Sequence, residues 1–304
     1  MGKPIKYNDV KTVDKDTIKF HDATFDKFIS SSGGIERGTM IALSGTSGAG
    51  KTTLCKKWQA DLGIQYTSVF FALESSKESV KKQTARIKTK GNELICDAKD
   101  FPTWSEFMKE IYETSPLIVI VDSLQHAAKL LSKENGVYKY DNYATIISDL
   151  YKWKDETQGI AILICQLNEK GKMEGPASTI FDVDCPINLV ANPKTGERFM
   201  ETTKNRMGKI GKIFYELTDS DECVKFYTED EWEIFKKNST LPDMINKTIY
   251  QYLKAISSHK NYSNFRKDFV KEYNKLCDSE LSDLNTIYKA IQLIQRLCEF
   301  HDIG

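Results

Sequence analysis

The chain has 304 residues, enough for one large domain with an appendage or for two modest domains. Hydrophobic residues make up 40% and charged residues 28%, which is typical of a folded protein and excludes a disordered, collagenous or disulfide-stapled chain. The 43 basic residues balance the 43 acidic ones, which excludes a wholly polycationic surface but not a local basic patch.

The seven cysteines are scattered and never form a CxxC pair, so neither a disulfide framework nor a zinc ribbon is indicated. Residues 1–20 lack an apolar signal core, and no stretch approaches the roughly 18 apolar residues of a membrane span. We therefore expect a cytoplasmic protein in a reducing compartment, with no membrane partner and with residues 1–20 as an N-terminal arm.

The most specific motif connects an apolar strand pattern at 39–44 to a helical pattern near 51–62. It has the form GxxxxGK[ST], in which backbone N–H groups surround phosphate oxygens, Lys51 reaches the β- and γ-phosphates and the Thr52 hydroxyl ligates Mg²⁺. An ordinary Gly-rich turn is the alternative, but the flanking strand and helix favour a site for ATP and Mg²⁺. The expected nucleotide-binding residues are Gly45, Thr46, Ser47, Gly48, Ala49, Gly50, Lys51, Thr52 and Thr53.

A second strand pattern, at 68–73, ends in Glu74 at the sheet edge where such folds bind ligands. Hydrolysis needs a group that activates water and is not engaged by the metal, and Glu74 is our candidate base. Spacing alone equally allows Glu74 to begin the helical stretch that follows it.

A third strand pattern, at 117–122, is a continuous apolar run that ends in Asp122, as expected for a strand buried on both faces of a parallel sheet. An isolated Asp after a strand is usually a helix cap or turn former. Paired with the GxxxxGK[ST] motif, Asp122 is instead the expected second Mg²⁺ ligand.

The alternation of strand and helix patterns up to residue 191 predicts an α/β fold with a mostly parallel sheet flanked by helices. Turn signals between the later strands predict antiparallel hairpins at the C-terminal edge of that sheet. The remaining expected strands are 160–165, 186–191, 198–204 and 212–217, and the remaining expected helices are 78–88, 104–114 and 142–157.

This rhythm ends near residue 229 and gives way to helical spacing, with an apolar stripe at Ile287, Ile291, Ile294 and Cys298. The organisation expected is an ATPase core at 21–228 and a small helical C-terminal region at 229–304. That region either packs against the core or serves in docking or oligomerisation.

Taken together, the motifs resemble the RecA-type ATPases, in particular the bacterial RadA and DnaB-helicase branch, over residues 20–220. The resemblance implies a RecA-like P-loop NTPase core with a short helix and a Gly-rich turn before its first core strand. It also favours Glu74 as the catalytic base. The matching segments are 72–75 (ALES), 121–125 (VDSLQ), 165–168 (CQLN), 171–176 (GKMEGP) and 204–208 (KNRMG).

Two further catalytic roles follow from the resemblance. Gln166 takes the place of a glutamine that senses the γ-phosphate, and 204–208 resembles the KNRFG motif, with Met207 in place of Phe. On a strand, Lys204 and Arg206 share a face. On composition alone, such a pair of cations usually lies on a solvent-exposed strand face. The family context instead implies that they reach a phosphate bound by a neighbouring subunit, as an arginine finger does. Such a site implies a closed homo-oligomeric ring.

The resemblance also places two loops, Gln125–Asp141 and 168–179, on a central channel that holds single-stranded DNA. Cations for the phosphate backbone and the nearby Tyr138 and Tyr140 suit binding without sequence choice, although ordinary polar surface loops are the alternative. The expected DNA-binding residues are Lys129, Lys133, Lys139, Lys170 and Lys172.

The function predicted is an ATP-dependent DNA motor: a homohexameric, single-strand-stimulated ATPase acting as helicase or branch-migration translocase in replication, recombination or repair. Other proteins of those processes are further candidate partners. The alternative is an assembly factor switched by ATP, such as a recombination mediator, helicase loader or KaiC-like switch, that does not unwind DNA.

Overall fold

The computed structural model describes residues 16–20, 22–167, 171, 182–192, 195–218, 223–233, 235–236, 259–277 and 284–302. Two compact units divide the chain, Met1–Thr228 and Glu229–Gly304. No helix within the described ranges is long and apolar enough to cross a lipid bilayer.

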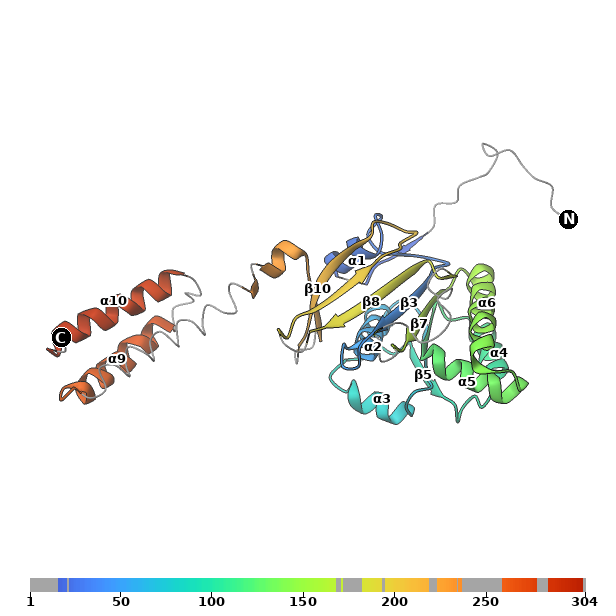
Figure 1. The fold of residues 1–304 in the computed structure, drawn as a ribbon, viewed down its shortest axis with the longest axis horizontal. Coiled ribbons are helices and arrows are strands. Elements are labelled where there is room, and N and C mark those ends of the chain that lie inside the picture. Colours follow the sequence, from blue (N-terminus) through green and yellow to red (C-terminus); the bar gives the residue numbers. More distant parts are fainter. Residues whose placement is uncertain are drawn as a thin grey trace, which may run out of the picture. The chain divides into compact units, whose positions relative to one another are not determined.

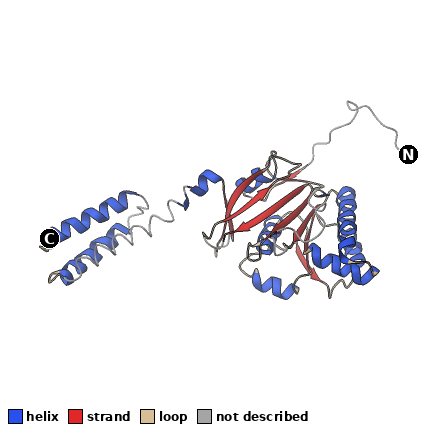
Figure 2. Cartoon of the chain, viewed as in Figure 1, coloured by secondary structure: helices blue, strands red, loops and turns tan. Residues whose placement is uncertain are grey.

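A nine-stranded sheet forms the centre of the first unit, in the order β11-β10-β9-β8-β3-β7-β6-β4-β5 (Figures 1 and 2). Strands β8, β3, β7, β6, β4 and β5 run parallel, and β9, β10 and β11 continue the sheet in antiparallel hairpins. The predicted α/β class, with antiparallel strands at one edge, is therefore confirmed. The strands are β3 Met40–Gly45, β4 Ser68–Ala72, β5 Glu93–Asp97, β6 Ile118–Asp122, β7 Ile160–Cys165, β8 Cys185–Ala191, β9 Arg198–Thr202, β10 Gly211–Leu217 and β11 Val224–Tyr227.

Helices cover both faces of this sheet and explain why its central strands are almost wholly apolar. One face packs against α1 (Ala23–Ile29) and α2 (Lys51–Leu62). The other packs against α4 (Trp104–Thr114), α5 (Leu124–Asn135) and α6 (Lys139–Thr157). Every residue of β4, β6 and β7 is buried as a result.

The segment before the first core strand has the expected short helix and Gly-rich turn. Asp22 caps α1 by accepting hydrogen bonds from the N–H groups of Thr24 and Phe25, each at 2.9 Å. Before it, β1 (Thr17–Ile18) pairs antiparallel with β2 (Ile35–Glu36). The end of the predicted N-terminal arm is thus packed on the core, while residues 1–15 lie outside the described residues.

The segment Gln125–Asp141, expected as a DNA-binding loop, is instead helical, and the loop prediction was wrong. Its apolar residues recur at helical spacing and bury one face of α5, and Gly136 ends that helix in a left-handed conformation (φ 71°). Only 136–138 separate α5 from α6. Helix α3 (Lys77–Gln83) is also shorter than the predicted 78–88.

The second unit contains α9 (Tyr262–Cys277) and α10 (Leu284–Phe300). Phe265 and Phe269 of α9 and Leu293, Ile294 and Leu297 of α10 are buried. Of the predicted apolar stripe, Ile294 is buried and Cys298 half-buried, whereas the side chains of Ile287 and Ile291 lie outside the described residues.

Candidate nucleotide-binding site

The loop between β3 and α2 has the backbone shape that the GxxxxGK[ST] motif predicts. Gly50 precedes α2 in a left-handed conformation (φ 93°) and brings no side chain to the helix start, whose N–H groups are thereby left available to a ligand. Gly45 has φ 157°, and a Cβ atom there would lie 2.6 Å from the Leu189 carbonyl oxygen of β8. Glycine at position 45 is thus required by close strand packing.

The antiparallel part of the sheet supports this loop from behind. The Tyr215 hydroxyl of β10 donates a 2.6 Å hydrogen bond to the Ala49 carbonyl oxygen, and Tyr215 is buried. A Cβ atom on Gly50 would lie 2.8 Å from the Leu217 side chain. Sequence analysis missed both β10 residues, because only the folded sheet brings them to the loop.

Lys51 reaches back over the loop, and its ammonium group donates to the carbonyl oxygens of Gly45 at 2.7 Å and Thr46 at 3.1 Å. Burial lowers the pKa of Lys51, while the neighbouring carboxylates Glu74 and Asp122 act in the opposite direction. The ammonium is therefore held at the loop where phosphate oxygens would arrive.

Asp122 faces the loop and does not cap α5. Its Oδ2 accepts a 2.9 Å hydrogen bond from the Thr52 hydroxyl, while its Oδ1 is buried without a partner. Burial raises the pKa of this carboxyl to about 6, assisted by the negative charge of Glu74. An unpartnered buried carboxylate oxygen beside a hydroxyl suits a cation such as Mg²⁺, which binds through few protein ligands. Asp122 and Thr52 therefore fit the predicted metal site.

Glu74 follows β4 and is exposed at the same edge as Asp122. Its backbone N–H donates to the Asp122 carbonyl oxygen at 2.9 Å, which joins the ends of β4 and β6. Helix α3 begins only at Lys77, with Ser76 as its cap, so Glu74 is not a helix-start residue. Its carboxylate lines the cavity described next.

A cavity of about 780 Å³ lies at the carboxyl ends of the parallel strands and brings most of the predicted residues together, but Ala49 is fully buried and does not line it. Gln166, which follows β7, lines it, and the Gln166 backbone N–H donates to the buried side-chain oxygen of Gln125 at 3.0 Å. Gln83, which sequence analysis did not select, lines it too. The lining residues are Gly45, Thr46, Ser47, Gly48, Gly50, Lys51, Thr52, Thr53, Glu74, Ser75, Gln83, Asp122, Gln166, Leu167 and Gly171.

Lys204 and Arg206 are not part of this cavity. The strand expected at 198–204 ends at Thr202, whose hydroxyl donates to the Lys204 carbonyl oxygen at 2.6 Å and turns the chain, so the shared strand face was a wrong prediction. The Lys204 ammonium donates to the Val183 carbonyl oxygen at 2.6 Å. The Arg206 guanidinium pairs with Asp184 at 3.0 Å, which raises the pKa of Arg206.

The candidate DNA-binding lysines are only partly described. Lys129 and Lys133 are exposed on α5, and beyond it the ring of Tyr138, 66% exposed, lies 5.4 Å from the Tyr140 ring in a tilted arrangement. Lys139 begins α6, but the structure does not describe its side chain. Lys170 and Lys172 lie outside the described residues. Three of the five lysines therefore have no described side-chain position.

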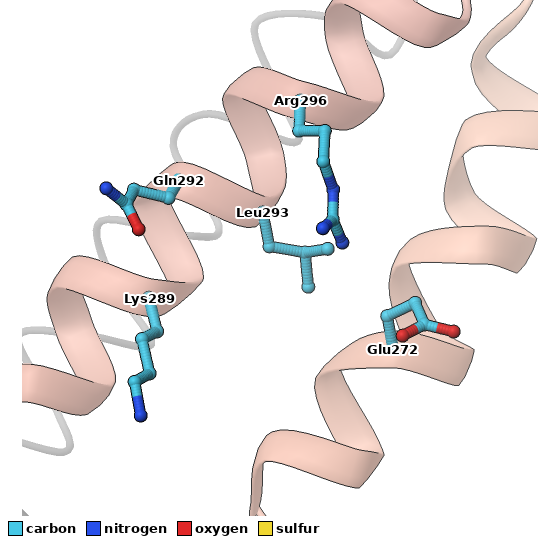
Figure 3. A pocket seen from close by; sticks show the side chains of 5 residues that line it. All are labelled: Glu272, Lys289, Gln292, Leu293 and Arg296. Atoms are coloured by element: carbon cyan, nitrogen blue, oxygen red, sulfur yellow. The ribbon is translucent and has the colours of Figure 1, made fainter.

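A second hollow, of about 320 Å³, lies between α9 and α10 of the C-terminal unit (Figure 3). Leu293 and Arg296 extend from α10 toward the helix that carries Glu272. Lys289 and Gln292 complete the lining. No Gly-rich loop contributes to it, so it lacks the features of a nucleotide cradle.

Comparison with known proteins supports the ATPase fold. Residues 22–101 match the family described as "ATPase: KaiC". The chain is similar to DNA repair protein RadA of Haemophilus influenzae, with 24% identity over 193 residues covering 60% of this chain and 39% of the relative. RadA of Escherichia coli is also 24% identical, over 62% of this chain and 40% of the relative. The chain thus spans about two fifths of the length of these curated relatives.

Among solved structures, a KaiC-like protein from Pyrococcus horikoshii superposes with a TM-score of 0.57 at 20% identity, over 70% of this chain and 99% of that one. The chain therefore has the RecA-type fold, and its residues 22–101 are similar to the KaiC ATPase family.

Proposed function

We propose that this protein is an ATP-driven DNA motor that works as a homo-oligomeric ring, with a hexamer as the expected size. The observation that carries the proposal is the separation of two sets of residues within one subunit. The nucleotide cavity lies at the end of β3 marked by Gly45, whereas Arg206 pairs with Asp184 beside the start of β3 at Met40.

The two ends of β3 are too far apart for Arg206 to serve its own active site. Five residue steps separate Met40 from Gly45, which is roughly 17 Å at about 3.3 Å per residue. A head-to-tail neighbour would bring Arg206 of one subunit to the cavity of the next, and such contacts close into rings. The arrangement therefore supports active sites completed between subunits.

Within one cavity the side chains have separate tasks. Lys51 and the loop N–H groups would hold the nucleotide phosphates, and Thr52 and Asp122 would hold Mg²⁺. When bound, the metal would neutralise charge on the phosphate oxygens. Glu74 would accept a proton from the attacking water, and Gln166 would contact the terminal phosphate.

Transition-state charge would be met by Lys204 and Arg206 of the neighbour. Turnover then requires assembly, because the residues of a single subunit lack these cations at the cavity.

DNA is proposed as the substrate on the strength of two features. The relatives named above are DNA repair proteins, and the exposed lysines of α5, with the Tyr138 and Tyr140 rings at the α5–α6 turn, suit a single-stranded backbone and its bases. We propose Lys129, Lys133, Lys139, Lys170 and Lys172 as the contacts, which would line a central channel.

The test measures ATPase activity with and without single-stranded DNA, together with strand displacement on a forked duplex. We expect stimulation and unwinding by the wild type, and retained nucleotide binding without either activity in Glu74→Gln. Lys133→Glu should lose the stimulation of ATPase activity by single-stranded DNA. Lys109→Glu, on the exposed face of α4, is the matched control and should keep it. Stimulated hydrolysis without unwinding or branch migration would refute the motor.

A second candidate function is an assembly factor switched by ATP, such as a recombination mediator, helicase loader or KaiC-like switch. The similarity of residues 22–101 to the KaiC family favours it. In that case ATP should change the oligomer size measured by light scattering, and Glu74→Gln should hold the assembled state without loss of function.

A further inference from the structure

The carboxylate of Asp184 joins four groups at the start of β3. Its Oδ2 accepts the Met40 backbone N–H at 2.9 Å and lies 3.7 Å from the Lys154 ammonium. Its Oδ1 accepts from an Arg206 nitrogen at 3.0 Å and lies 3.4 Å from the Tyr151 hydroxyl. With a side chain only 14% exposed, Asp184 is a fixed point among these groups.

Arg206 is held through one end of its guanidinium. The same nitrogen, Nη1, also donates to the Tyr151 hydroxyl at 3.1 Å, and the Arg206 backbone N–H donates to the Asp184 carbonyl oxygen at 3.1 Å. Tyr151 is itself fixed by the Lys154 ammonium, which lies 3.9 Å from the centre of its ring. Nε and Nη2 of Arg206 have no hydrogen-bond partner among the described residues.

The turn that carries Arg206 is anchored on both sides of it. Asn205 donates to the Ile29 carbonyl oxygen at 3.0 Å, and the Met207 carbonyl oxygen accepts from the Ser31 N–H at 3.3 Å. Gly208 allows this approach, since a Cβ atom there would lie 2.9 Å from the Ser31 nitrogen. The backbone is therefore fixed while the Arg206 side chain stays 53% exposed.

We propose that Asp184 and Tyr151 are positioning residues for Arg206, holding one nitrogen of its guanidinium so that the remaining donors are presented to an anion on a second copy of this chain. The inference rests on the proposed trans role of Arg206. A guanidinium group held at one end keeps its remaining N–H donors in a fixed orientation, and this suits bidentate binding of a phosphate. An unheld arginine would lose rotamer freedom on each encounter.

The experiment uses Asp184→Asn and Tyr151→Phe in the full chain. Each should lower kcat for ATP hydrolysis, by about 10- to 100-fold for Asp184→Asn and less for Tyr151→Phe, because small misplacements of a catalytic group have effects of this size. The KM for ATP and the affinity for a fluorescent ATP analogue should be unchanged, since the cavity lies at the other end of β3.

Mixed assemblies separate a positioning role from a general structural one. Asp184→Asn subunits retain an intact cavity, and Glu74→Gln subunits retain an intact Arg206. A 1:1 mixture should recover about a quarter of the wild-type rate, which is above the rate of either homomer alone, because half of the subunits have Glu74 and half of these have an intact neighbour. A mixture of Asp184→Asn with Arg206→Ala is the control and should not exceed the residual rate of Asp184→Asn alone.

Three outcomes would overturn the inference: wild-type kcat in Asp184→Asn, a raised KM for ATP, or no recovery in its mixture with Glu74→Gln. If Asp184→Asn does not fold, Tyr151→Phe carries the same test, because it removes only a hydroxyl. A mixture of Arg206→Ala with Glu74→Gln tests the proposed function separately. Failure of that mixture refutes the trans role, whereas its recovery without recovery of the Asp184→Asn mixture refutes positioning alone.

Discussion

Replacing Asp122 with asparagine should stabilise the nucleotide-free protein at neutral pH while abolishing turnover. Burial raises the pKa of this carboxyl from 3.8 to about 6, so its ionised form costs about 3 kcal/mol of folding free energy at pH 7. Asparagine carries no charge and keeps an acceptor for Thr52. Its amide N–H₂ would occupy the unpartnered Oδ1 position, at a cost of about 1–2 kcal/mol. The net gain expected at pH 7 is therefore about 1–2 kcal/mol.

The sign of the pH dependence follows from the raised pKa. Between pH 4 and 6 the folded state holds the proton that the unfolded state has lost, so the wild type loses stability as the pH rises through this window. The Asp122→Asn protein does not lose stability in this window. Its free energy of unfolding should therefore exceed that of the wild type by an amount that grows from pH 4 to 6 and then levels off.

Urea unfolding at several pH values measures this advantage, with the fluorescence of the buried tryptophans of the core, Trp58, Trp104 and Trp153, as the signal. Asp100→Asn is the matched control, since Asp100 pairs with Lys77 and its pKa is lowered. That control should destabilise the protein at pH 7 and lose its effect as the pH falls. An Asp122→Asn advantage that is independent of pH would refute the reasoning.

Three further predictions concern the support of the site. Tyr215→Phe removes the hydrogen bond to the Ala49 carbonyl oxygen and should cost about 1 kcal/mol in urea unfolding while raising the KM for ATP. Gln125→Leu removes the acceptor of the Gln166 N–H and should lower kcat about tenfold with little change in ATP affinity by fluorescence titration. Gly45→Ala would place a Cβ atom 2.6 Å from the Leu189 carbonyl oxygen, and both thermal stability and ATP binding should fall; an unchanged melting temperature would contradict the close packing of β3 on β8.

The sequence predicted those parts of the fold whose signal is local. The central strands are continuous apolar runs between helices. The polar residues that follow these strands, Lys51, Glu74, Asp122 and Gln166, line one cavity. Each of these residues follows a parallel strand, so the class of sheet alone places them at one edge.

Two strands that the sequence analysis missed lack a local signal of that strength. Strand β5 lies at the sheet edge, where its pattern alternates weakly, and β11 has only four residues. Helix α5, in contrast, has a clear helical apolar face. The loop expected there came from the family resemblance and not from the residues of the segment. The contacts of Tyr215 with the loop and of Asp184 with Arg206 join positions far apart in the chain, and spacing carries no information about such pairs.

In the proposed assembly, β3 acts as a spacer of fixed length between two active sites. One end leads into the phosphate loop of its own subunit, and the other end is bonded through Asp184 to the arginine offered to the neighbour. A one-residue insertion in β3 would displace one end by about 3.3 Å and turn the following side chains to the opposite face. The spacing between the two active sites would therefore tolerate changes in loop length, but not a change in the length of this strand.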